Sequence, residues 1–137
     1  MDRASVSDAD CDFMRRFESC QLPEKEWTHE AHVRVGWIAQ MSASAEEAEA
    51  RLREGILRFN TEVLGRRQQY HETVTMAFAR IIRDRIREGE GWPDFIARSA
   101  DILSRDDPIL LRYYSGDRLF SDEARANFVA PDIQPLP

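Results

Sequence analysis

Residues 44–59 read SAEEAEARLREGILRF and carry the clearest helical signal in the chain. Ser44 is followed three residues later by Glu47, a capping box whose two side chains satisfy free amides at the start of a helix. The apolar residues that follow recur every three or four positions: Ala48, Leu52, Ile56 and Phe59. This spacing places them on one face of a helix. The stretch therefore predicts an amphipathic helix that buries one side against the rest of the protein.

Helix-start signals recur along most of the chain. Ser7 with Asp10 opens a predicted helix that ends before Pro23, and Thr28 caps a second one that runs to about Met41. A loop is expected over 60–69, followed by a helix that starts near Tyr70 and ends before Gly89. The next helix starts at Pro93 and includes Leu103. Short helices are expected over 107–114 and from Ser121. Helices are thus expected from one end of the chain almost to the other.

The C-terminal tail differs from the rest because residues 131–137 contain three prolines, which exclude a regular helix or a central strand. No alternating strand pattern, internal repeat or linker interrupts the helical signals, and 137 residues is the usual size of one domain. We therefore predict a single all-α domain over residues 1–137, a bundle of four to five main helices with short C-terminal helices. Residues 1–7 and 131–137 are expected to be flexible or extended.

Composition limits the classes of partner. The net charge of −6 would repel a phosphate backbone, so nucleic acid is not expected. No apolar run approaches the roughly 18 to 20 residues of a membrane span, and residues 1–12 are polar and acidic rather than leader-like. Cys11 and Cys20 do not indicate a disulfide framework. The sequence predicts a cytoplasmic protein that does not associate with a membrane. Its expected partner is a small molecule. A homodimer is compatible with a thin bundle that has an apolar face to hide.

All three histidines of the chain lie near predicted helix starts. His29 and His32 are three residues apart, which on a helix puts their side chains on adjacent turns of one face, roughly 5–6 Å apart. His71 begins another predicted helix and could reach the pair if the two helices are neighbours. Three neutral imidazoles leave a coordination position for water or substrate, as in catalytic zinc sites. The pattern predicts one divalent transition metal, with zinc, iron, nickel and manganese as alternatives.

Four further residues are candidates for a site around the histidines. Glu72, beside His71, could move protons as a catalytic base, or it could be a fourth ligand or a first-turn acid favoured by the helix dipole. Arg34, Tyr70 and Tyr113 are candidate substrate-binding residues, because a guanidinium can bind an anion and a phenol can donate a hydrogen bond. The alternative for the arginine is a solvated position. For the tyrosines it is a place in the core with the hydroxyl at the surface.

Two motifs resemble a group of small uncharacterised bacterial proteins: WTHEAH over residues 27–32 and YHETVT over residues 70–75. The C-terminal part is similar to the same group over residues 111–115, 118–121 and 128–137. The likeness covers nearly the whole chain beyond the first dozen residues. It implies the same all-helical fold and, since the group has no assigned activity, it points to no particular reaction.

Two functions from different classes follow from these residues. In the first, His29, His32 and His71 hold one metal ion that activates water or orients a substrate in an enzyme acting on a small molecule. In the second, the protein is a non-catalytic helical module whose histidines are structural and whose groove binds a ligand or a partner protein. The two hypotheses differ in whether the imidazoles meet around one point or each bonds to the main chain.

Overall fold

The computed structural model describes residues 5–137, which form helices and connecting segments with no β-strand among them. The long helices are α1 (Asp8–Glu18), α2 (His29–Ser42), α3 (Ala45–Glu62) and α4 (Glu72–Arg85). The short helices are α5 (Trp92–Ala97), α6 (Ala100–Leu103), α7 (Gly116–Leu119) and α8 (Asp122–Ala126). Single 3-10 turns are η2 (Glu24–Glu26), η3 (Arg67–Gln69) and η4 (Ile109–Arg112). The predicted all-α bundle with short C-terminal helices is therefore confirmed.

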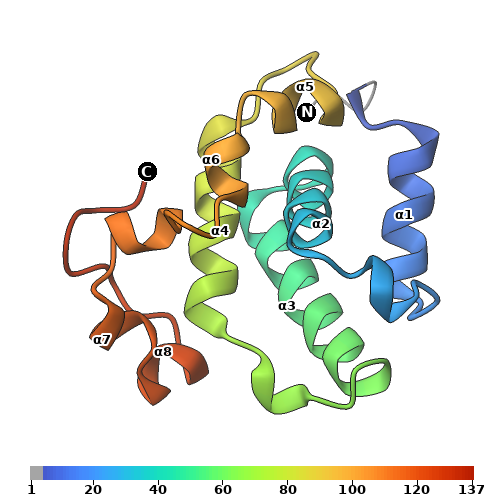
Figure 1. Ribbon diagram of the computed structural model, residues 1–137. Coiled ribbons are helices and arrows are strands. Elements are labelled where there is room, and N and C mark those ends of the chain that lie inside the picture. Colours follow the sequence, from blue (N-terminus) through green and yellow to red (C-terminus); the bar gives the residue numbers. More distant parts are fainter. Residues whose placement is uncertain (1–4) are drawn as a thin grey trace.

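The three helices α2, α3 and α4 form the centre of the bundle, and each contacts the other two. Figure 1 shows α1 on one side of this centre, where it contacts α2 and α3. The C-terminal helices α7 and α8 lie on the other side, where α8 contacts α4 and α7 contacts α8 (Figure 1). Any side chain that points between the central helices is thus enclosed by segments distant in the sequence.

The predicted helix caps are present at the first three long helices. Ser7 Oγ accepts from the Asp10 amide at 3.0 Å, and the Asp10 carboxylate accepts from the Ser7 amide at 2.9 Å. Thr28 Oγ1 accepts from the amide of Ala31 at 3.2 Å, and Ser44 Oγ accepts from that of Glu47 at 3.2 Å. Each bond satisfies an amide that has no partner within its own helix. Local sequence therefore fixes where these helices begin.

Aromatic rings join α1, α3 and the segment before α2. Phe17 stacks on Trp27 with ring centroids 4.7 Å apart, and Trp27 lies 4.9 Å from Phe59. Gly55 makes room for this cluster, because a Cβ atom there would lie 2.7 Å from Cε2 of Phe17. Phe17 and Phe59 are fully buried. Burial of a side chain of this size contributes about 1.5–3 kcal/mol, so the cluster is a main anchor of α1.

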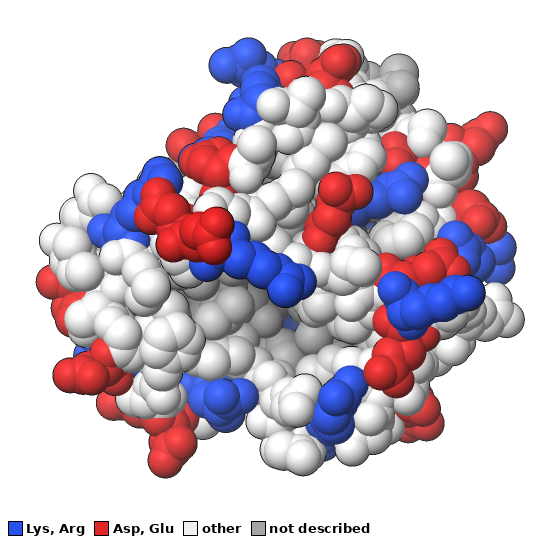
Figure 2. Space-filling model, viewed as in Figure 1, with Lys and Arg blue, Asp and Glu red and all other residues white. Residues whose placement is uncertain are grey.

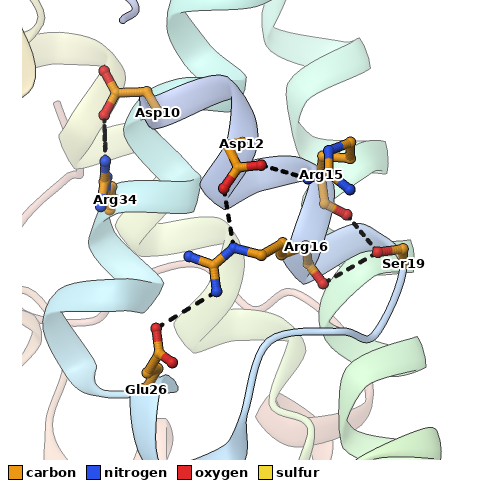
Figure 3. Close-up of polar contacts among 7 residues, drawn as sticks. All are labelled: Asp10, Asp12, Arg15, Arg16, Ser19, Glu26 and Arg34. Atoms are coloured by element: carbon orange, nitrogen blue, oxygen red, sulfur yellow. Dashed lines mark hydrogen bonds and ion pairs between the residues drawn. The ribbon is translucent and has the colours of Figure 1, made fainter. Parts of the chain in front are cut away.

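Polar contacts complete the packing of α1 (Figure 3). Asp12 accepts hydrogen bonds from Arg15 and Arg16 on its own helix. Arg16 also reaches Glu26 of η2, with Nη1 and Oε1 3.7 Å apart. These groups are largely exposed, and such pairs contribute little to stability.

Several boundaries differ from the sequence prediction. α3 continues to Glu62, so the connection to α4 is shorter than the expected loop over 60–69. The expected helix from Pro93 to Leu103 is broken into α5 and α6 at Arg98, whose side chain binds Glu90 at 2.6–2.7 Å. The expected helix over 107–114 is only the 3-10 turn η4, and α7 is an additional short helix. Tertiary partners of single side chains decide these details.

The proline-rich tail is extended, as predicted, and it is tied to the segment before α7. The Ile133 amide donates to the carbonyl of Tyr113 at 2.9 Å, and Asp132 accepts from the Ser115 amide at 2.8 Å. Of the expected flexible N-terminus, residues 1–4 lie outside the described residues, whereas Ser7 caps α1. Within residues 5–137, every helix is too short or too polar to cross a membrane.

Candidate functional site

A cavity of about 320 Å³ lies between α2, α3 and α4, and it is called the inner cavity below. Its apolar wall includes Leu52 and Ile56 of α3 and Val74, Phe78 and Ile82 of α4. The side chains in the wall that can form hydrogen bonds are His29, His32 and Thr75. Figure 2 shows a hollow in the region where Figure 1 places these helices, mostly white inside and with basic side chains at its edge. The centre of the bundle therefore offers an apolar space with few polar groups.

Gly36 sets the distance between two walls of the inner cavity. It faces α4, and a Cβ atom at this position would lie 2.9 Å from Cδ1 of Ile82. Real side chains do not approach so closely, so any other residue would push the Ile82 side chain aside. Glycine costs roughly 1 kcal/mol in a helix interior relative to alanine. Here it allows α2 and α4 to pack closely beside the cavity.

His29 is fixed by a main-chain carbonyl from a distant segment. Its Nε2 lies 3.0 Å from the carbonyl oxygen of Ile102. A carbonyl oxygen only accepts, so Nε2 carries the proton and Nδ1 has a free lone pair in the neutral ring. The ring edge packs against Phe78, with centroids 5.5 Å apart. Nδ1 makes no hydrogen bond with any residue of 5–137.

His32 is fixed in the opposite tautomer. Its Nδ1 lies 2.7 Å from the carbonyl oxygen of Thr28, so Nδ1 donates and Nε2 keeps the lone pair. The ring packs on Trp27 with centroids 3.8 Å apart. Burial lowers the pKa of His32 to about 4, an effect that the bond to Thr28 opposes and the neighbouring His29 reinforces. At neutral pH the ring is uncharged, and within the described chain its Nε2 has no hydrogen-bond partner.

His71 has a purely structural set of contacts. Its Nδ1 accepts from the amide of Val74 at 3.1 Å and so caps α4, while its Nε2 donates to the carbonyl of Leu119 at 2.8 Å. Burial lowers the pKa of His71, helped by the charge of Arg125 and opposed by the bond to Leu119. Both ring nitrogens are therefore engaged, and the residue lies outside the wall of the inner cavity.

The three histidines accordingly do not present three free nitrogens to one point. His29 and His32 share the inner cavity, whereas the lone pair of His71 is used by a backbone amide. No group of three or more His, Cys, Asp or Glu side chains that could hold a metal ion is found within residues 5–137. The metal site of His29, His32 and His71 stays a prediction from the sequence, without support from this geometry.

Glu72 belongs to a separate polar cluster at the start of α4. Its carboxylate accepts from Arg53 at 2.6–3.1 Å and from the Tyr70 hydroxyl at 2.6 Å. Burial alone would raise the pKa of Glu72, but the bonds from Arg53 and Tyr70 outweigh it and lower the pKa. Burial and the bond to Glu72 raise the pKa of Tyr70. The lowered pKa makes this carboxylate a weaker proton acceptor than a free one, and the role of Glu72 as a catalytic base stays a prediction. Glu72 and Tyr70 also lie outside the inner cavity.

The other two candidate substrate-binding residues lie elsewhere. Arg34 donates to Asp10 through Nε and Nη2 at 3.1 and 2.7 Å, a contact between α2 and α1 that Figure 3 shows. Its guanidinium also lies over the ring of Phe13, 4.5 Å from the centroid. Tyr113 is half-buried against the core. Neither residue lines the inner cavity, so the structure does not bring Arg34, Tyr70 and Tyr113 together around it.

A second hollow of about 410 Å³, the outer cavity, adjoins the inner one. The two share His29, Val74 and Phe78 as wall residues. The outer cavity also contains Arg105, which our sequence analysis missed. Arg105 lies in a loop between predicted helices, and no local pattern distinguishes it from other surface arginines.

Comparisons of the chain with protein-family models, with curated proteins and with solved structures find no match.

Proposed function

We propose that the protein binds an apolar small molecule that carries one hydrogen-bond donor, in the inner cavity. The observation that carries this proposal is an apolar cavity of about 320 Å³ whose wall includes His29 and His32, each of which keeps one ring nitrogen without a hydrogen bond to any residue of 5–137. Ligand sites are typically concave, mostly apolar and equipped with a few polar groups that fix orientation. An apolar cavity of about 150 Å³ already accepts benzene, so a substituted single ring is a suitable size.

The tautomers of the two histidines determine the kind of polar group. The carbonyls of Ile102 and Thr28 each take one N–H, so the remaining nitrogens of His29 and His32 are acceptors. A ligand oxygen or nitrogen that only accepts would meet a lone pair and gain nothing. A ligand with an O–H or N–H group can donate to it instead. Phenols and alcohols are therefore preferred over ethers and ketones of the same shape.

Metal binding by the same histidines is less well supported. Donation of one ring N–H to a carbonyl does orient metal-ligating imidazoles in many proteins. A mononuclear site, however, needs about three protein ligands, and both nitrogens of His71 are engaged by Val74 and Leu119. The geometry therefore favours the non-catalytic ligand-binding module over the metal enzyme.

The proposal can be tested with 4-ethylphenol and its methyl ether, 4-ethylanisole, in which a methyl group replaces the hydrogen of the donor. We expect 4-ethylphenol to shift the amide NMR signals of residues lining the inner cavity and to bind more tightly than the ether. The variant His32→Phe keeps a ring on Trp27 but removes the acceptor. It should weaken phenol binding about tenfold, the value of one hydrogen bond, and leave ether binding nearly unchanged.

Two controls separate cavity binding from other effects. Val74→Phe fills the wall shared by both cavities and should abolish binding of both compounds. His71→Asn changes a histidine outside the inner cavity and keeps a capping side chain, so it should bind like the original protein. Binding that survives Val74→Phe would refute the proposed site. A thermal shift with zinc but none with phenol would favour the metal enzyme instead.

A further inference from the structure

The outer cavity lies beside the inner one, and part of its wall is exposed. Leu111 and Phe120 line the outer cavity and are large apolar side chains with exposed fractions of 39% and 66%. Exposed apolar side chains that gather at a cavity rim are typical of ligand-binding grooves. Val74 and Phe78 belong to both walls, so the two cavities lie on either side of these side chains, and a ligand that reaches both must pass them.

Charge distinguishes the two neighbouring cavities. No aspartate or glutamate lines either cavity, and His32 at the inner end is neutral at pH 7. Arg105 is the one side chain in either wall with a permanent charge, and it makes no ion pair or hydrogen bond with any residue of 5–137. The nearby Arg112, by contrast, donates to Asp107 at 2.8 Å. An arginine without a protein partner at the end of an apolar groove can receive an anion.

We propose that the ligand is an amphipathic anion of the hydroxyaryl carboxylate class, with its hydroxyl on His32 and its carboxylate on Arg105. The aromatic body fills the inner cavity, and an aliphatic spacer passes Val74 and Phe78. This inference rests on the proposed function, which supplies the inner half of the site. It adds the anionic group and the chemical class of the ligand. A guanidinium and a carboxylate form two parallel hydrogen bonds, which fixes the orientation of the whole molecule.

The test compares three compounds by NMR titration and calorimetry: 3-(4-hydroxyphenyl)propanoate, 4-ethylphenol, which lacks the carboxylate, and 3-phenylpropanoate, which lacks the hydroxyl. A series with one to four methylene groups in the spacer finds the length that spans His32 and Arg105. We expect the best hydroxyaryl carboxylate to bind about two- to fivefold more tightly than 4-ethylphenol, the range of an ion pair exposed to solvent.

Matched variants assign that gain to one residue. Arg105→Gln should remove the advantage of the carboxylates and leave 4-ethylphenol binding unchanged. Arg112→Gln removes the same charge from an arginine that already has partners, and it should preserve the advantage. Higher salt should weaken the carboxylates more than the phenol, because the contact with Arg105 is exposed to solvent.

The failures of the two proposals can be told apart. Equal affinity for the phenol and the carboxylates, or an equal loss in Arg105→Gln and Arg112→Gln, would overturn the anionic ligand and leave the proposed cavity intact. If none of the three compounds binds, the proposed function fails and this inference fails with it. A 4-ethylphenol titration that perturbs only the outer cavity would also overturn both.

Discussion

At the scale of single residues, the main-chain partner of each imidazole decides what that histidine can do. His71 accepts from one backbone amide and donates to one backbone carbonyl, so its hydrogen-bonding capacity is fully used. His29 and His32 each donate one N–H to a carbonyl and keep one lone pair. The sequence pattern predicted all three rings as ligands of one metal ion. The hydrogen bonds divide them into one helix cap and two rings in the wall of the inner cavity that each keep one acceptor nitrogen.

The lowered pKa values of His32 and His71 predict a pH dependence of stability. Both rings are neutral when folded, and their pKa values lie below the unfolded value of about 6.5. Their contribution is fully present above that pH and is lost as the pH falls. For His32, with a folded pKa of about 4, the free energy of unfolding should fall by about 2 kcal/mol between pH 7 and pH 5.

Urea denaturation at several pH values checks this prediction, with His32→Phe as the control. The variant should show a clearly smaller decrease between pH 7 and pH 5, the remainder coming from His71. The carboxylates with lowered pKa values, such as Glu72 and Glu90, lose their contribution at lower pH. Identical slopes for the variant and the original protein would show that His32 is not held neutral by its surroundings.

At the scale of helices, local signals set the beginnings and contacts set the ends and the packing. Ser7, Thr28 and Ser44 cap α1, α2 and α3 where the sequence indicated. α4 is capped by His71, and histidine is a less common capping residue. The sequence therefore left two roles open for His71, a metal ligand or a structural residue. Gly36 and Gly55 both lie inside helices and both permit close packing, but against different kinds of neighbour.

That difference predicts opposite outcomes for two identical substitutions. In Gly55→Ala the new methyl group would meet the ring of Phe17, which is fully buried and stacked on Trp27. Such overpacking should cost about 1–3 kcal/mol. In Gly36→Ala the neighbour is the end of the Ile82 side chain, which can rotate into the inner cavity. The gain in helix propensity of about 1 kcal/mol should then offset most of the strain.

Urea denaturation of both variants gives the free energies, and titration with 4-ethylphenol reports on the cavity. Gly36→Ala should remain within about 1 kcal/mol of the original protein but bind the phenol more weakly. If Gly36→Ala is as destabilising as Gly55→Ala, then Ile82 cannot move and the inner cavity is more rigid than we infer.

At the scale of the whole molecule, the C-terminal third is attached to α4 by a few buried polar contacts. The Thr73 hydroxyl donates to the carbonyl of Asn127 at 2.9 Å and accepts from the amide of Val129 at 3.1 Å. The Tyr114 hydroxyl donates to the Val129 carbonyl at 2.7 Å. These bonds place α7 and α8 on the side of α4 away from α1 (Figure 1). They also hold Leu119 and Phe120 at the wall of the outer cavity.

Thr73→Val should therefore loosen the C-terminal third. The substitution keeps the shape of a buried side chain but leaves the Val129 amide and the Asn127 carbonyl without this partner. The cost should be about 1–3 kcal/mol, and hydrogen exchange should become faster over residues 127–137. Thr61→Val is the matched control, because its hydroxyl bonds only to Leu57 within α3. Equal effects of the two substitutions would show that the tertiary contact of Thr73 is unimportant.

The sequence by itself determined that the protein is helical and where most of its helices lie. The reason is physical: a helix depends on hydrogen bonds and side chains within about four residues, so Ser44, Glu47 and the spacing of Leu52 and Ile56 are sufficient signals. The extended tail followed in the same way from its prolines.

Only the tertiary structure decided which side chains share a site. The direction of a side chain between helices depends on how each helix is rotated and on which distant carbonyl it meets. Ile102 and Leu119 accept from His29 and His71, and both lie far along the chain from those histidines. The same dependence brings Arg105 to the wall of the outer cavity. No local pattern encodes such contacts, because they form when the central helices and the C-terminal segments pack together.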